Sequence, residues 1–380
     1  MERIKVLQYI TSLNDGGAET LVKDYCLLLD KSKFHVKVVT LWLLGESANL
    51  KALKDNGIEI IVLFNKWSIL NKILYRFLGS RYVSAHFKKI IKRERPSVIH
   101  AHLELLQSLL PIQYLLKGIS LFYTCHSRPR NFLGDIRPKE HAAAKILLSN
   151  QNLHIIALHD DMAQEINDMF NKPCAVVIRN GIDLEKYTGI DESISNIRKS
   201  IGIDQNAFVV GHVGRFNVIK NHNFLLDVFE LIHCKQSNSH LLLIGSGELE
   251  SEIRARIEQK GLVRNVTILS HRSDVPRLLK AMDVFVFPSL YEGFGIVLIE
   301  AQAAGKACYV SDTINKSTFV SDKIIPLSLN DGPEVWCKEI LNPSIKGEKL
   351  YDISSYNIRT EVLKLQQLYL EANEESTDTI

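Results

Sequence analysis

The sequence lacks any long hydrophobic run. No stretch approaches the roughly 20 apolar residues of a membrane-spanning helix. The opening residues, MERIKVLQYI, also lack the apolar segment of about 7–15 residues and the small-residue cleavage site of a secretory signal. We therefore expect a cytoplasmic protein that is neither exported nor integral to a membrane.

Close cysteine pairs and a strong net charge are also absent. The formal charge of +3 over 380 residues is too small to indicate nucleic-acid binding. The cysteines are scattered without zinc-like spacing, mostly in or beside apolar runs, which favours reduced core thiols over disulfides or a metal centre. The six are Cys26, Cys125, Cys174, Cys234, Cys308 and Cys337.

What the sequence does contain is a series of short apolar runs separated by intervals of helical length. Continuous rather than alternating apolarity indicates strands buried on both faces, as in a parallel sheet covered by helices. The pattern occurs twice, which predicts an α/β protein with two doubly wound Rossmann-like domains facing a deep interdomain cleft. The expected strands span residues 4–10, 36–42, 58–64, 97–102, 120–125, 154–158, 174–178, 208–214, 241–245, 266–270, 284–289, 307–311 and 323–327.

A domain boundary is expected at the Asn-Gly turn of residues 180–181 and the polar stretch after it, which has no strand pattern. We expect a first domain over residues 1–183 and a second over 184–356. The helical pattern of 357–380 predicts a last helix that packs back onto the first domain. In such folds ligands bind outside the carboxyl ends of the strands.

Two glutamates stand on either side of a glycine-bracketed aromatic residue in 291-YEGFGIVLIEAQAAGKACYVSD-312. A helix is expected from about Gly295, so Glu292 falls in the loop before it and Glu300 more than one turn inside it. That places the carboxylates on the order of 10–15 Å apart, whereas paired glycosidase carboxylates stand roughly 5–9.5 Å apart. A shared proton-transfer role is therefore not expected.

The helix start between these glutamates predicts an anion site, because the backbone N–H groups of Phe294, Gly295 and Ile296 have no partner within the helix. A ligand with hydroxyl groups at both ends and a diphosphate between them would fit, as in a nucleotide-sugar. The alternative is two surface glutamates, one of them favourable to the helix dipole.

Basic residues follow another expected strand. In 211-GHVGRFNVIKNH-222, Arg215 and Lys220 stand beside glycines that permit close backbone approach, a combination suited to a diphosphate. A strand–loop–helix junction with solvated bases is the alternative. After the first strand, Gly16 and Gly17 stand at a helix start, but neither G-x-G-x-x-G nor a Walker lysine pattern is present. A Rossmann dinucleotide site or a P-loop is therefore not expected.

Together, the glycine pair with Glu19, the G-R-F…K-N-H block, the N-G-I-D turn and E-G-F-G-x-x-x-x-E resemble the retaining glycosyltransferases of family 4, which have the two-Rossmann B-type fold. The resemblance runs from residue 4 to about residue 312 and is to bacterial capsular, exopolysaccharide or lipopolysaccharide enzymes in particular. It implies transfer of a hexose or N-acetylhexosamine from a nucleotide-sugar, by family habit a UDP-sugar, to a glycan or lipid-linked oligosaccharide. It also implies an α-linkage made by front-face displacement, with no metal or other cofactor.

The resemblance implies an acceptor-binding first domain, a donor-binding second domain and roles for individual positions. Arg215 and Lys220 match the bases that hold the donor diphosphate and stabilise the departing charge. Glu292 matches the residue that contacts donor-sugar hydroxyls, and Glu300 matches the partner of the ribose diol. His126 matches the histidine of a T-x-H motif near the donor sugar and the acceptor. The other donor-binding positions are Gly16 and Gly17 over the phosphates, Arg272 in the nucleobase loop, and Phe294, Gly295 and Ile296 beside the sugar.

Three positions depart from the family pattern. The family usually has glycine at Ser270, serine at His159 and proline at Arg179. These positions lie on framework turns, so the departures weaken the predicted placement of the nucleobase more than the predicted reaction. Asp160 and Asp161 could suggest a metal site, but acidic residues at a helix N-terminus are the better interpretation.

Residues 65–97 carry nine Lys and Arg residues and one acid, Glu94. Helical spacing gives apolar stripes interleaved with Trp67, Tyr75 and Tyr82, and basic amphipathic helices of this kind suit an anionic membrane surface. We expect peripheral docking on the cytoplasmic face of the inner membrane, where a lipid-linked acceptor would lie. A core-packed stripe under a solvated basic face is the alternative. The stripes are Leu70, Ile73, Leu74 and Phe77, then Phe87, Ile90, Ile91 and Glu94.

Two other functions remain open on the sequence. A nucleotide-sugar epimerase of the B-type fold would keep the donor site but need water access and carboxylates near the anomeric carbon, which the separation of Glu292 and Glu300 opposes. A non-catalytic nucleotide-sugar-binding partner protein would be favoured by loss of a diphosphate base or a glutamate, and none is missing. Nucleic-acid binding has only residues 65–97 in its support.

Overall fold

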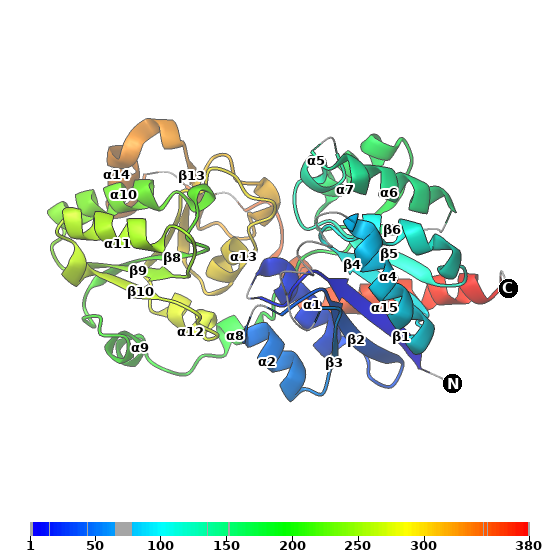
Figure 1. Cartoon of the computed structure of the whole chain (residues 1–380). Helices are drawn as coiled ribbons and strands as arrows, with labels where there is room; N and C mark the ends of the chain where they lie inside the picture. The colour runs from blue at the N-terminus through cyan, green and yellow to red at the C-terminus, as the bar shows by residue number, and fades with distance from the viewer. Residues whose placement is uncertain are drawn as a thin grey trace. The chain divides into compact units, whose positions relative to one another are not determined.

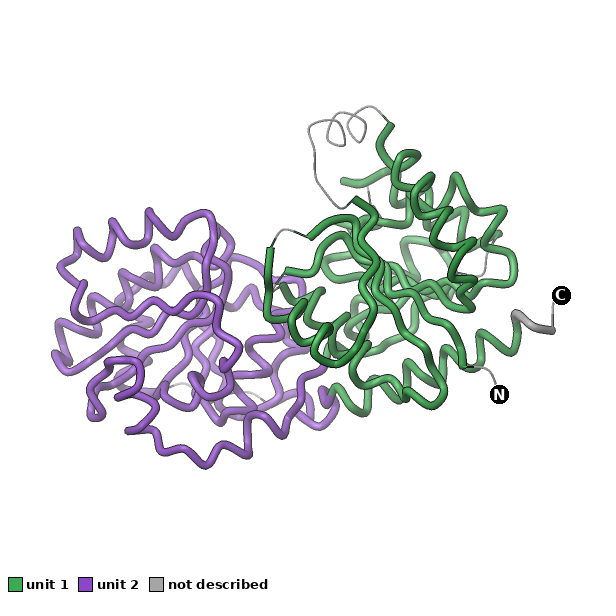
Figure 2. The backbone as a smooth tube through the Cα atoms, turned by 60° about the horizontal axis from the view of Figure 1, so that its bottom comes forward, with its two compact units in different colours: residues 1–180, 358–380 green, residues 181–357 purple. Residues whose placement is uncertain are grey.

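The computed structural model describes residues 3–378, apart from residues 15, 44, 65–77, 135, 151, 152, 345 and 348, with side chains up to residue 375. The chain divides into two compact units (Figure 2). Unit 1 comprises residues 1–180 with 358–380, and unit 2 comprises residues 181–357. Each unit contains one parallel sheet with helices packed on it (Figure 1), so the predicted pair of doubly wound Rossmann-like folds is confirmed.

Unit 1 is built on a seven-stranded parallel sheet in the order β3-β2-β1-β4-β5-β6-β7. Its strands are β1 (Ile4–Ile10), β2 (Phe34–Thr40), β3 (Glu59–Val62), β4 (Val98–His102), β5 (Ser120–Thr124), β6 (His154–Ala157) and β7 (Ala175–Val177). Its helices are α1 (Gly17–Leu28), α2 (Ala48–Asp55), α4 (Ser80–Glu94), η1 (Leu106–Ser108), η2 (Leu110–Leu115), α5 (Pro129–Phe132), α6 (Pro138–Asn150), α7 (Asp160–Phe170) and α15 (Ile358–Asp378).

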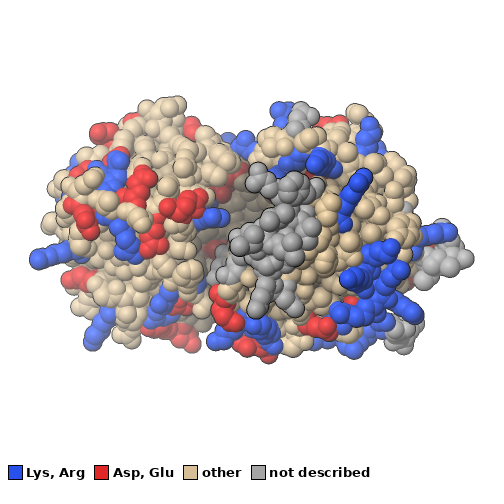
Figure 3. All heavy atoms as spheres, in the orientation of Figure 1, with Lys and Arg blue, Asp and Glu red and all other residues tan. Residues whose placement is uncertain are grey.

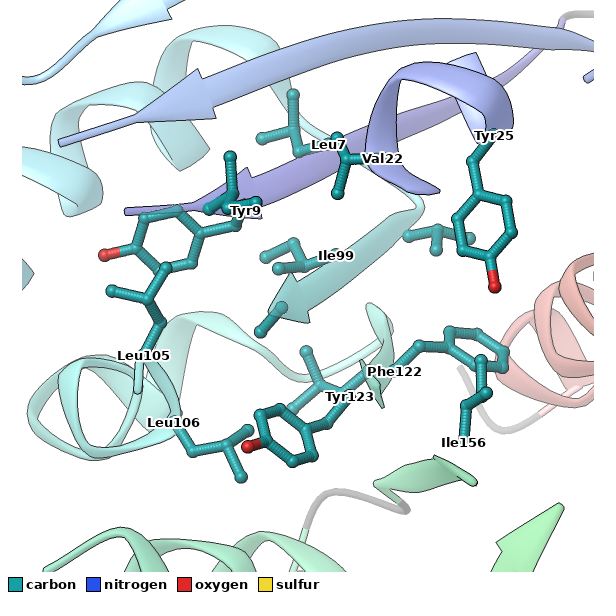
Figure 4. Close-up of a cluster of buried hydrophobic side chains, with 14 of the residues drawn as sticks. Leu7, Tyr9, Val22, Tyr25, Ile99, Leu105, Leu106, Phe122, Tyr123 and Ile156 are labelled. Carbon is teal, nitrogen blue, oxygen red and sulfur yellow. The ribbon is translucent and has the colours of Figure 1, made fainter. Parts of the chain in front are cut away.

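The core of unit 1 forms because its central strands are mostly apolar and are buried along their whole length, as in β4 and β5. Figure 4 shows Leu7 from β1, Val22 from α1 and Ile99 from β4 within this core. Each fully buried aliphatic side chain of this kind contributes roughly 1.5–3 kcal/mol. Burial on both sheet faces therefore holds the strand ends, and the polar residues on them, in fixed positions.

Strand β2 begins two residues before the predicted strand. Phe34 and His35 pair with Ile4 and Lys5 of β1. Phe34 is buried whereas His35 is exposed, so the start of β2 alternates in polarity. The prediction relied on continuous apolar runs and therefore missed these paired residues.

The last helix, α15, packs on unit 1. Leu365, Tyr369 and Ala372 belong to the unit 1 core. The Ser120 hydroxyl donates a hydrogen bond to the Ala372 carbonyl at 2.9 Å, which ties the helix to the start of β5. The helix thus closes one face of the sheet and places Tyr369 among its buried polar residues.

Helix α4 has a buried apolar face and an exposed basic face. Val83, Phe87, Ile90 and Ile91 are buried in the unit 1 core. Lys and Arg side chains gather over this helix on the face seen in Figure 3. The predicted stripe on Phe87, Ile90 and Ile91 therefore does not face a membrane, and the core-packed alternative holds for α4. The first stripe, Leu70, Ile73, Leu74 and Phe77, lies outside the described residues, as do Trp67 and Tyr75.

Helix α7 explains one departure from the family pattern. The ring Nδ1 of His159 accepts a hydrogen bond from the Met162 amide at 3.2 Å, so the histidine caps the helix as a serine would. Asp160 and Asp161 occupy the first turn, as predicted for acids at a helix N-terminus. Arg179 pairs with Asp160 at 2.5 Å.

Unit 2 is built on a six-stranded parallel sheet in the order β10-β9-β8-β11-β12-β13. Its strands are β8 (Phe208–Val213), β9 (Ser239–Ile244), β10 (Val266–Leu269), β11 (Val284–Phe287), β12 (Ala307–Ser311) and β13 (Ile324–Leu327). Its helices are α8 (Glu185–Thr188), α9 (Ile194–Ser200), η3 (Val218–Lys220), α10 (His222–Lys235), α11 (Glu250–Gln259), η4 (Val263–Asn265), α12 (Val275–Lys280), α13 (Ile296–Ala303), η5 (Lys316–Thr318), η6 (Leu329–Asp331), α14 (Gly332–Leu341) and η7 (Ile353–Tyr356).

The strand order reverses beside the first strand of each sheet. The reversal lies between β1 and β4 in unit 1, and between β8 and β11 in unit 2. Doubly wound sheets bind their ligands at this switch point, outside the carboxyl ends of the strands. The loops that follow these strands are therefore where a site is expected in each unit. No described helix has both the length and the apolarity to cross a membrane.

Candidate active site

The loop after β8 lies tightly against the loop after β9, and glycines make this possible. A Cβ on Gly245, whose φ is +151°, would stand 2.0 Å from the carbonyl oxygen of Gly214. A Cβ on Gly247 would stand 2.4 Å from the carbonyl oxygen of Phe216. At Gly214 itself, a Cβ would stand 3.1 Å from Cε of Lys220. The lysine stem can therefore lie directly on the backbone of its own loop.

Lys220 and Glu292 form an ion pair at the unit 2 switch point, with 2.6 Å between Nζ and Oε1. The pair joins the loop after β8 to the loop after β11, and the two side chains are only 15% and 12% exposed. Between the same loops, the Leu290 amide donates to the Ile219 carbonyl at 2.8 Å. The Lys220 ammonium also lies 4.5 Å from the ring centroid of Phe287. Motif matching assigns the two residues to different parts of a donor, whereas the structure brings them into direct contact.

Two buried histidines adjoin Lys220. The rings of His212 on β8 and His222 on α10 stand 4.9 Å apart, edge to face. Burial, helped by the nearby Lys220 charge, lowers the pKa of His222 to about 4 and that of His212 well below its usual range, so both rings are neutral at neutral pH. The sequence analysis gave neither a role: His222 entered only as the last residue of the K-N-H block, and His212 was missed although a histidine inside an apolar strand run, as in 208-FVVGHVG-214, is a visible signal.

Helix α13 begins directly after Gly295, close to its predicted start. Gly295 has a φ of +82°, a conformation that favours glycine. The first N–H groups of any helix lack intrahelical partners, and the first turn of α13 has no acidic residue to cover them. A Cβ on Gly295 would lie 3.6 Å from Cγ of Glu292, so the ion pair stands beside the helix start. An anion bound here would meet both backbone donors and Lys220.

Glu300 lies one turn inside α13 and accepts a hydrogen bond from the hydroxyl of Tyr187 on α8 at 2.7 Å. Glu292 is bound to Lys220 instead. The two glutamates therefore have different partners, which suits two separate contacts with an elongated ligand.

The two predicted arginines differ in how firmly they are held. The side chain of Arg215 is 71% exposed and lies 3.2 Å from Glu248, an exposed pair of a kind that contributes little. Its guanidinium can turn to another anion at low cost. Arg272 binds Asp274 through two hydrogen bonds of 2.7 and 2.6 Å, which raise the pKa of the guanidinium. The Arg272 loop is therefore better placed to offer its backbone than its side chain.

Phe294 has a packing role. Its side chain is 4% exposed and belongs to a cluster with Ile182 and Ile299. Its ring centroid lies 5.7 Å from that of Tyr356. Ile296 packs against the same cluster. These contacts fix the backbone before α13. The predicted donor-binding role therefore suits that backbone rather than the two side chains.

In unit 1, Gly16 and Gly17 stand at the start of α1, after β1. A Cβ on Gly16 would collide with the Glu19 carboxylate, 2.4 Å away, while Gly17 has open space around it. The Ser12 hydroxyl donates to Glu19 Oε1 at 3.3 Å, so this carboxylate folds back over the helix start. A side chain at residue 16 would therefore have to displace the carboxylate end of Glu19 from the helix start.

His126 follows β5 at the carboxyl edge of the unit 1 sheet. Its Nε2 lies 2.9 Å from Nδ1 of His102, and Nε2 of His102 lies 2.8 Å from Oε1 of Gln8. Burial lowers the pKa of His126 to about 3 and that of His102 well below its usual range, so both rings are neutral. The sequence analysis missed Gln8 and His102, whose signal is a polar residue inside an otherwise apolar strand. Among the described residues, no group of three His, Cys, Asp or Glu side chains could hold a metal ion.

Both units match known family models. Residues 15–186 match the family described as Glycosyltransferase Family 4, and residues 193–323 match the family described as Glycosyl transferases group 1. Among solved structures, Anabaena HepE in complex with UDP and glucose superposes with a TM-score of 0.68 at 19% identity, covering 99% of each chain. The sucrose-phosphate synthase of Thermosynechococcus elongatus also gives 0.68, at 17% identity and the same coverage.

Three relatives are similar over most of their length. EpsF of Bacillus subtilis is 28% identical, covering 90% of this chain and 88% of its own. The capsular polysaccharide biosynthesis glycosyltransferase CapH of Staphylococcus aureus is 24% identical, covering 97% and 99%. The UDP-Gal:alpha-D-GlcNAc-diphosphoundecaprenol alpha-1,3-galactosyltransferase of Escherichia coli is 28% identical, covering 74% and 77%. The present chain is thus a family 4-like glycosyltransferase, and its two Rossmann-like units are those of the B-type fold.

Proposed function

We propose that this glycosyltransferase moves a hexose or N-acetylhexosamine from a nucleotide-sugar, with a UDP-sugar favoured, onto a glycan or lipid-linked oligosaccharide during synthesis of a bacterial surface polysaccharide. The observation that carries the proposal is the Lys220–Glu292 ion pair beside the start of α13. It combines a cation, a carboxylate and backbone donors at one switch point. The name of the E. coli relative, with its UDP-Gal donor and diphosphoundecaprenol-linked substrate, supports this donor and acceptor class.

The donor would lie along the carboxyl edge of unit 2. Its diphosphate takes Lys220, the exposed Arg215 and the N–H groups at the start of α13. Glu292, released from Lys220, accepts hydrogen bonds from hydroxyls of the sugar. Glu300, oriented by Tyr187, accepts from the ribose. The Arg272 loop lies under the base through its backbone.

Transfer then proceeds on one face of the sugar with retention of configuration. The acceptor hydroxyl forms a bond to the anomeric carbon as the bond from that carbon to the diphosphate oxygen breaks. The acceptor proton passes to a leaving-group oxygen, so the products are the α-linked glycoside and the nucleoside diphosphate. Lys220, Arg215 and the α13 N-terminus stabilise the charge that develops on the leaving group.

The same cations make a metal ion unnecessary in this proposal. Lys220 and Arg215 supply two positive charges to the diphosphate, the task that a divalent cation performs in metal-dependent transferases. The aromatic ring of Phe287 lies beside the Lys220 ammonium, and His212 and His222 are neutral. The positive charge at this point is therefore that of the ammonium.

The acceptor side belongs to unit 1 in this proposal. A lipid-linked acceptor would bring the enzyme to the cytoplasmic face of the membrane, where the basic face of α4 can meet anionic headgroups. Because the apolar face of α4 is buried, this contact would be electrostatic and would weaken with salt.

A nucleotide-sugar panel tests the proposal directly. We expect one UDP-sugar, and UDP itself, to raise the melting temperature of the protein in the presence of EDTA. Incubation with that sugar and an undecaprenyl-diphosphate glycan should give an α-linked product, read by the anomeric proton coupling. The Lys220→Ala variant should lose both the stabilisation and the product. A β-linked product would contradict retention, and dependence on added metal would contradict the role of the two basic residues.

A further inference from the structure

The polar side chains inside unit 1 form one continuous hydrogen-bonded chain. His126 Nε2 lies 2.9 Å from His102 Nδ1, and His102 Nε2 lies 2.8 Å from Gln8 Oε1. The Gln8 amide nitrogen donates to the Tyr369 hydroxyl at 3.1 Å. The same hydroxyl lies 2.6 Å from Nδ1 of His100. Beyond it, Nε2 of His100 lies 2.7 Å from the hydroxyl of Thr124. We call these six residues the histidine relay.

Every member of the relay except His126 is fully buried. Gln8, His100, His102, Tyr369 and Thr124 are 0% exposed. His126 is half-buried at the carboxyl edge of the sheet. Burial holds the pKa values of His100 and His102 well below their usual range. Each imidazole therefore carries a single proton, and each can donate one hydrogen bond and accept one.

Neutral rings make the relay directional, and the Gln8 amide sets the direction. Its oxygen accepts, so His102 must donate through Nε2 and accept through Nδ1. His126 must then donate through Nε2. On the other side, the amide nitrogen donates to Tyr369, whose hydroxyl donates to His100. Turning the Gln8 amide over would reverse every proton in the relay.

We propose that Gln8 is a positioning residue for His126: through His102 it holds the His126 proton on Nε2 and leaves Nδ1 bare, so that this edge of unit 1 binds a hydrogen-bond donor, a sugar hydroxyl, rather than an anion. The inference deepens the proposed function and rests on it for the identity of the ligand.

The geometry leaves Nδ1 of His126 as the ring atom that can accept a hydrogen bond from a ligand. Among the described residues, His102 is the one that hydrogen-bonds His126, and it takes Nε2. A bare Nδ1 carries a lone pair, which attracts an O–H group and repels a phosphate oxygen. With its pKa lowered to about 3 by burial, His126 stays neutral and keeps this preference at any physiological pH.

Tyr369 joins the Gln8 amide to His100. Its hydroxyl sits between the Gln8 nitrogen and His100, so it accepts from one and donates to the other. Tyr369 belongs to α15, 361 residues from Gln8 in the sequence. A residue of the last helix thereby influences the proton position on a histidine it does not bond.

Nitrogen-15 spectra of histidine tautomers test the relay without any substrate. Protein labelled on histidine is recorded at pH 7.5, with His126 assigned by the loss of its signals in His126→Gln. We expect the proton of His126 on Nε2 and a bare Nδ1. In Tyr369→Phe the Gln8 nitrogen loses its acceptor, so the amide can turn and the His126 signals should move toward an average of both tautomers. The kcat/KM for transfer should fall roughly three- to tenfold, the cost of a hydrogen bond.

Two further variants separate the relay from general packing. Gln8→Glu keeps an acceptor toward His102, so it should retain the wild-type tautomer of His126, whereas Gln8→Leu should lose it. Tyr9→Phe removes another buried hydroxyl of unit 1, one bound to Ser108 at 3.0 Å, and should leave the His126 signals unchanged. Circular dichroism confirms that each variant is folded.

Two results would overturn the inference: a wild-type His126 protonated on Nδ1, or Gln8→Leu and Tyr369→Phe spectra identical to wild type. Either result with normal transfer would refute the relay and leave the proposed function intact. An Nε2 proton in a protein that transfers no sugar would instead refute the proposed function and leave the relay standing.

Discussion

Lys220 and Glu292 neutralise each other across the unit 2 switch point, with 2.6 Å between ammonium and carboxylate. The pair is mostly shielded from water, so its attraction is weakened less than that of a surface pair. A donor diphosphate must therefore compete with Glu292 for Lys220. Binding of the diphosphate and release of the carboxylate become one event, which couples the anion site to the sugar site.

Glu292→Gln should separate binding from transfer. The amide keeps the shape of the carboxylate but removes the charge that occupies Lys220. We expect UDP to bind about three- to tenfold more tightly, corresponding to a charge interaction of the order of 1 kcal/mol. Transfer should fall by roughly 100-fold or more, because the sugar loses its carboxylate contact. Calorimetric titration with UDP and a transfer assay measure the two effects.

Glu248→Gln is the matched control, since Glu248 pairs with Arg215 in an exposed position, with 56% of its side chain accessible. It should change UDP affinity by less than about twofold. Lys220→Met should weaken UDP binding and also abolish transfer. UDP affinity in Glu292→Gln equal to that of wild type would rule out competition between carboxylate and diphosphate.

The Tyr187→Phe substitution should weaken binding of the donor without disturbing the fold. It removes the 2.7 Å hydrogen bond to Glu300, which then loses its fixed orientation. We expect the KM for the nucleotide-sugar to rise about fivefold with kcat little changed, because one hydrogen bond of about 1 kcal/mol is lost from binding. Steady-state kinetics with the donor varied measure this. Tyr114→Phe, an exposed tyrosine of unit 1, should leave both constants at wild-type values. An unchanged KM in Tyr187→Phe would show that Glu300 does not contribute to donor binding.

Gly245→Ala should disrupt the Lys220 loop, because the new Cβ would collide with the Gly214 carbonyl at 2.0 Å. Gly261→Ala is the control: Gly261 also has a positive φ, +69°, but no atom lies within 4 Å of the added Cβ. We expect roughly 2–4 kcal/mol of destabilisation at Gly245, from strain and overpacking together, against roughly 1 kcal/mol at Gly261. Urea unfolding of unit 2 and UDP binding read out the difference. Equal losses in both variants would show that the close approach to Gly214 is not required.

How much of the fold and of the candidate site could be predicted depends on the kind of structural information that each sequence pattern carries. Continuous apolar runs predicted all thirteen described strands, because strands buried on both faces are mostly apolar along their length. They misplaced the start of β2, where His35 is exposed next to the buried Phe34. The motifs predicted Lys220 and Glu292 as site residues through their resemblance to the family 4 pattern.

The contacts between those residues could not be predicted. The Lys220–Glu292 pair joins loops 72 positions apart, and only the sheet order brings β8 beside β11. The histidine relay is harder still, because Gln8, His102 and Tyr369 look like isolated polar residues in apolar segments. Periodicity reports which face of an element is buried, but not which polar residue meets which across the core.

The basic face of α4 should bind anionic membranes only weakly and in a salt-dependent manner. Replacing Lys89, Lys92 and Arg93 together by alanine should remove most binding to phosphatidylglycerol vesicles at low salt, since each surface cation contributes about 1 kcal/mol. Sedimentation with vesicles at low and high salt measures this. Lys199→Ala with Arg264→Ala, exposed bases of unit 2, should retain wild-type binding. Equal binding by both multiple variants would place the membrane contact elsewhere on the protein.

The buried carboxyl of Glu140 should make unit 1 less stable as the pH rises. Glu140 is 1% exposed, and its Oε2 accepts a long hydrogen bond, 3.3 Å, from the Gln107 backbone amide. Burial raises its pKa to about 7 from an ordinary value of 4.5. Between these values the folded protein binds the proton more tightly than the unfolded chain does. The resulting stability is fully present below about pH 4.5 and is lost as the pH rises through 7.

Glu140→Gln removes this dependence, because the amide keeps its size and acceptor oxygen but cannot ionise. Relative to wild type, we expect the variant to be more stable at pH 8 than at pH 5 by roughly 2–3 kcal/mol, the linkage value of the raised pKa. Hydrogen exchange of β4 and β5 amides, which report opening of the unit 1 core, measures the difference at each pH. Glu258→Gln on the exposed face of α11 should show no such difference. A constant gap between Glu140→Gln and wild type across this range would mean that the Glu140 carboxyl is already ionised in the folded protein at pH 5.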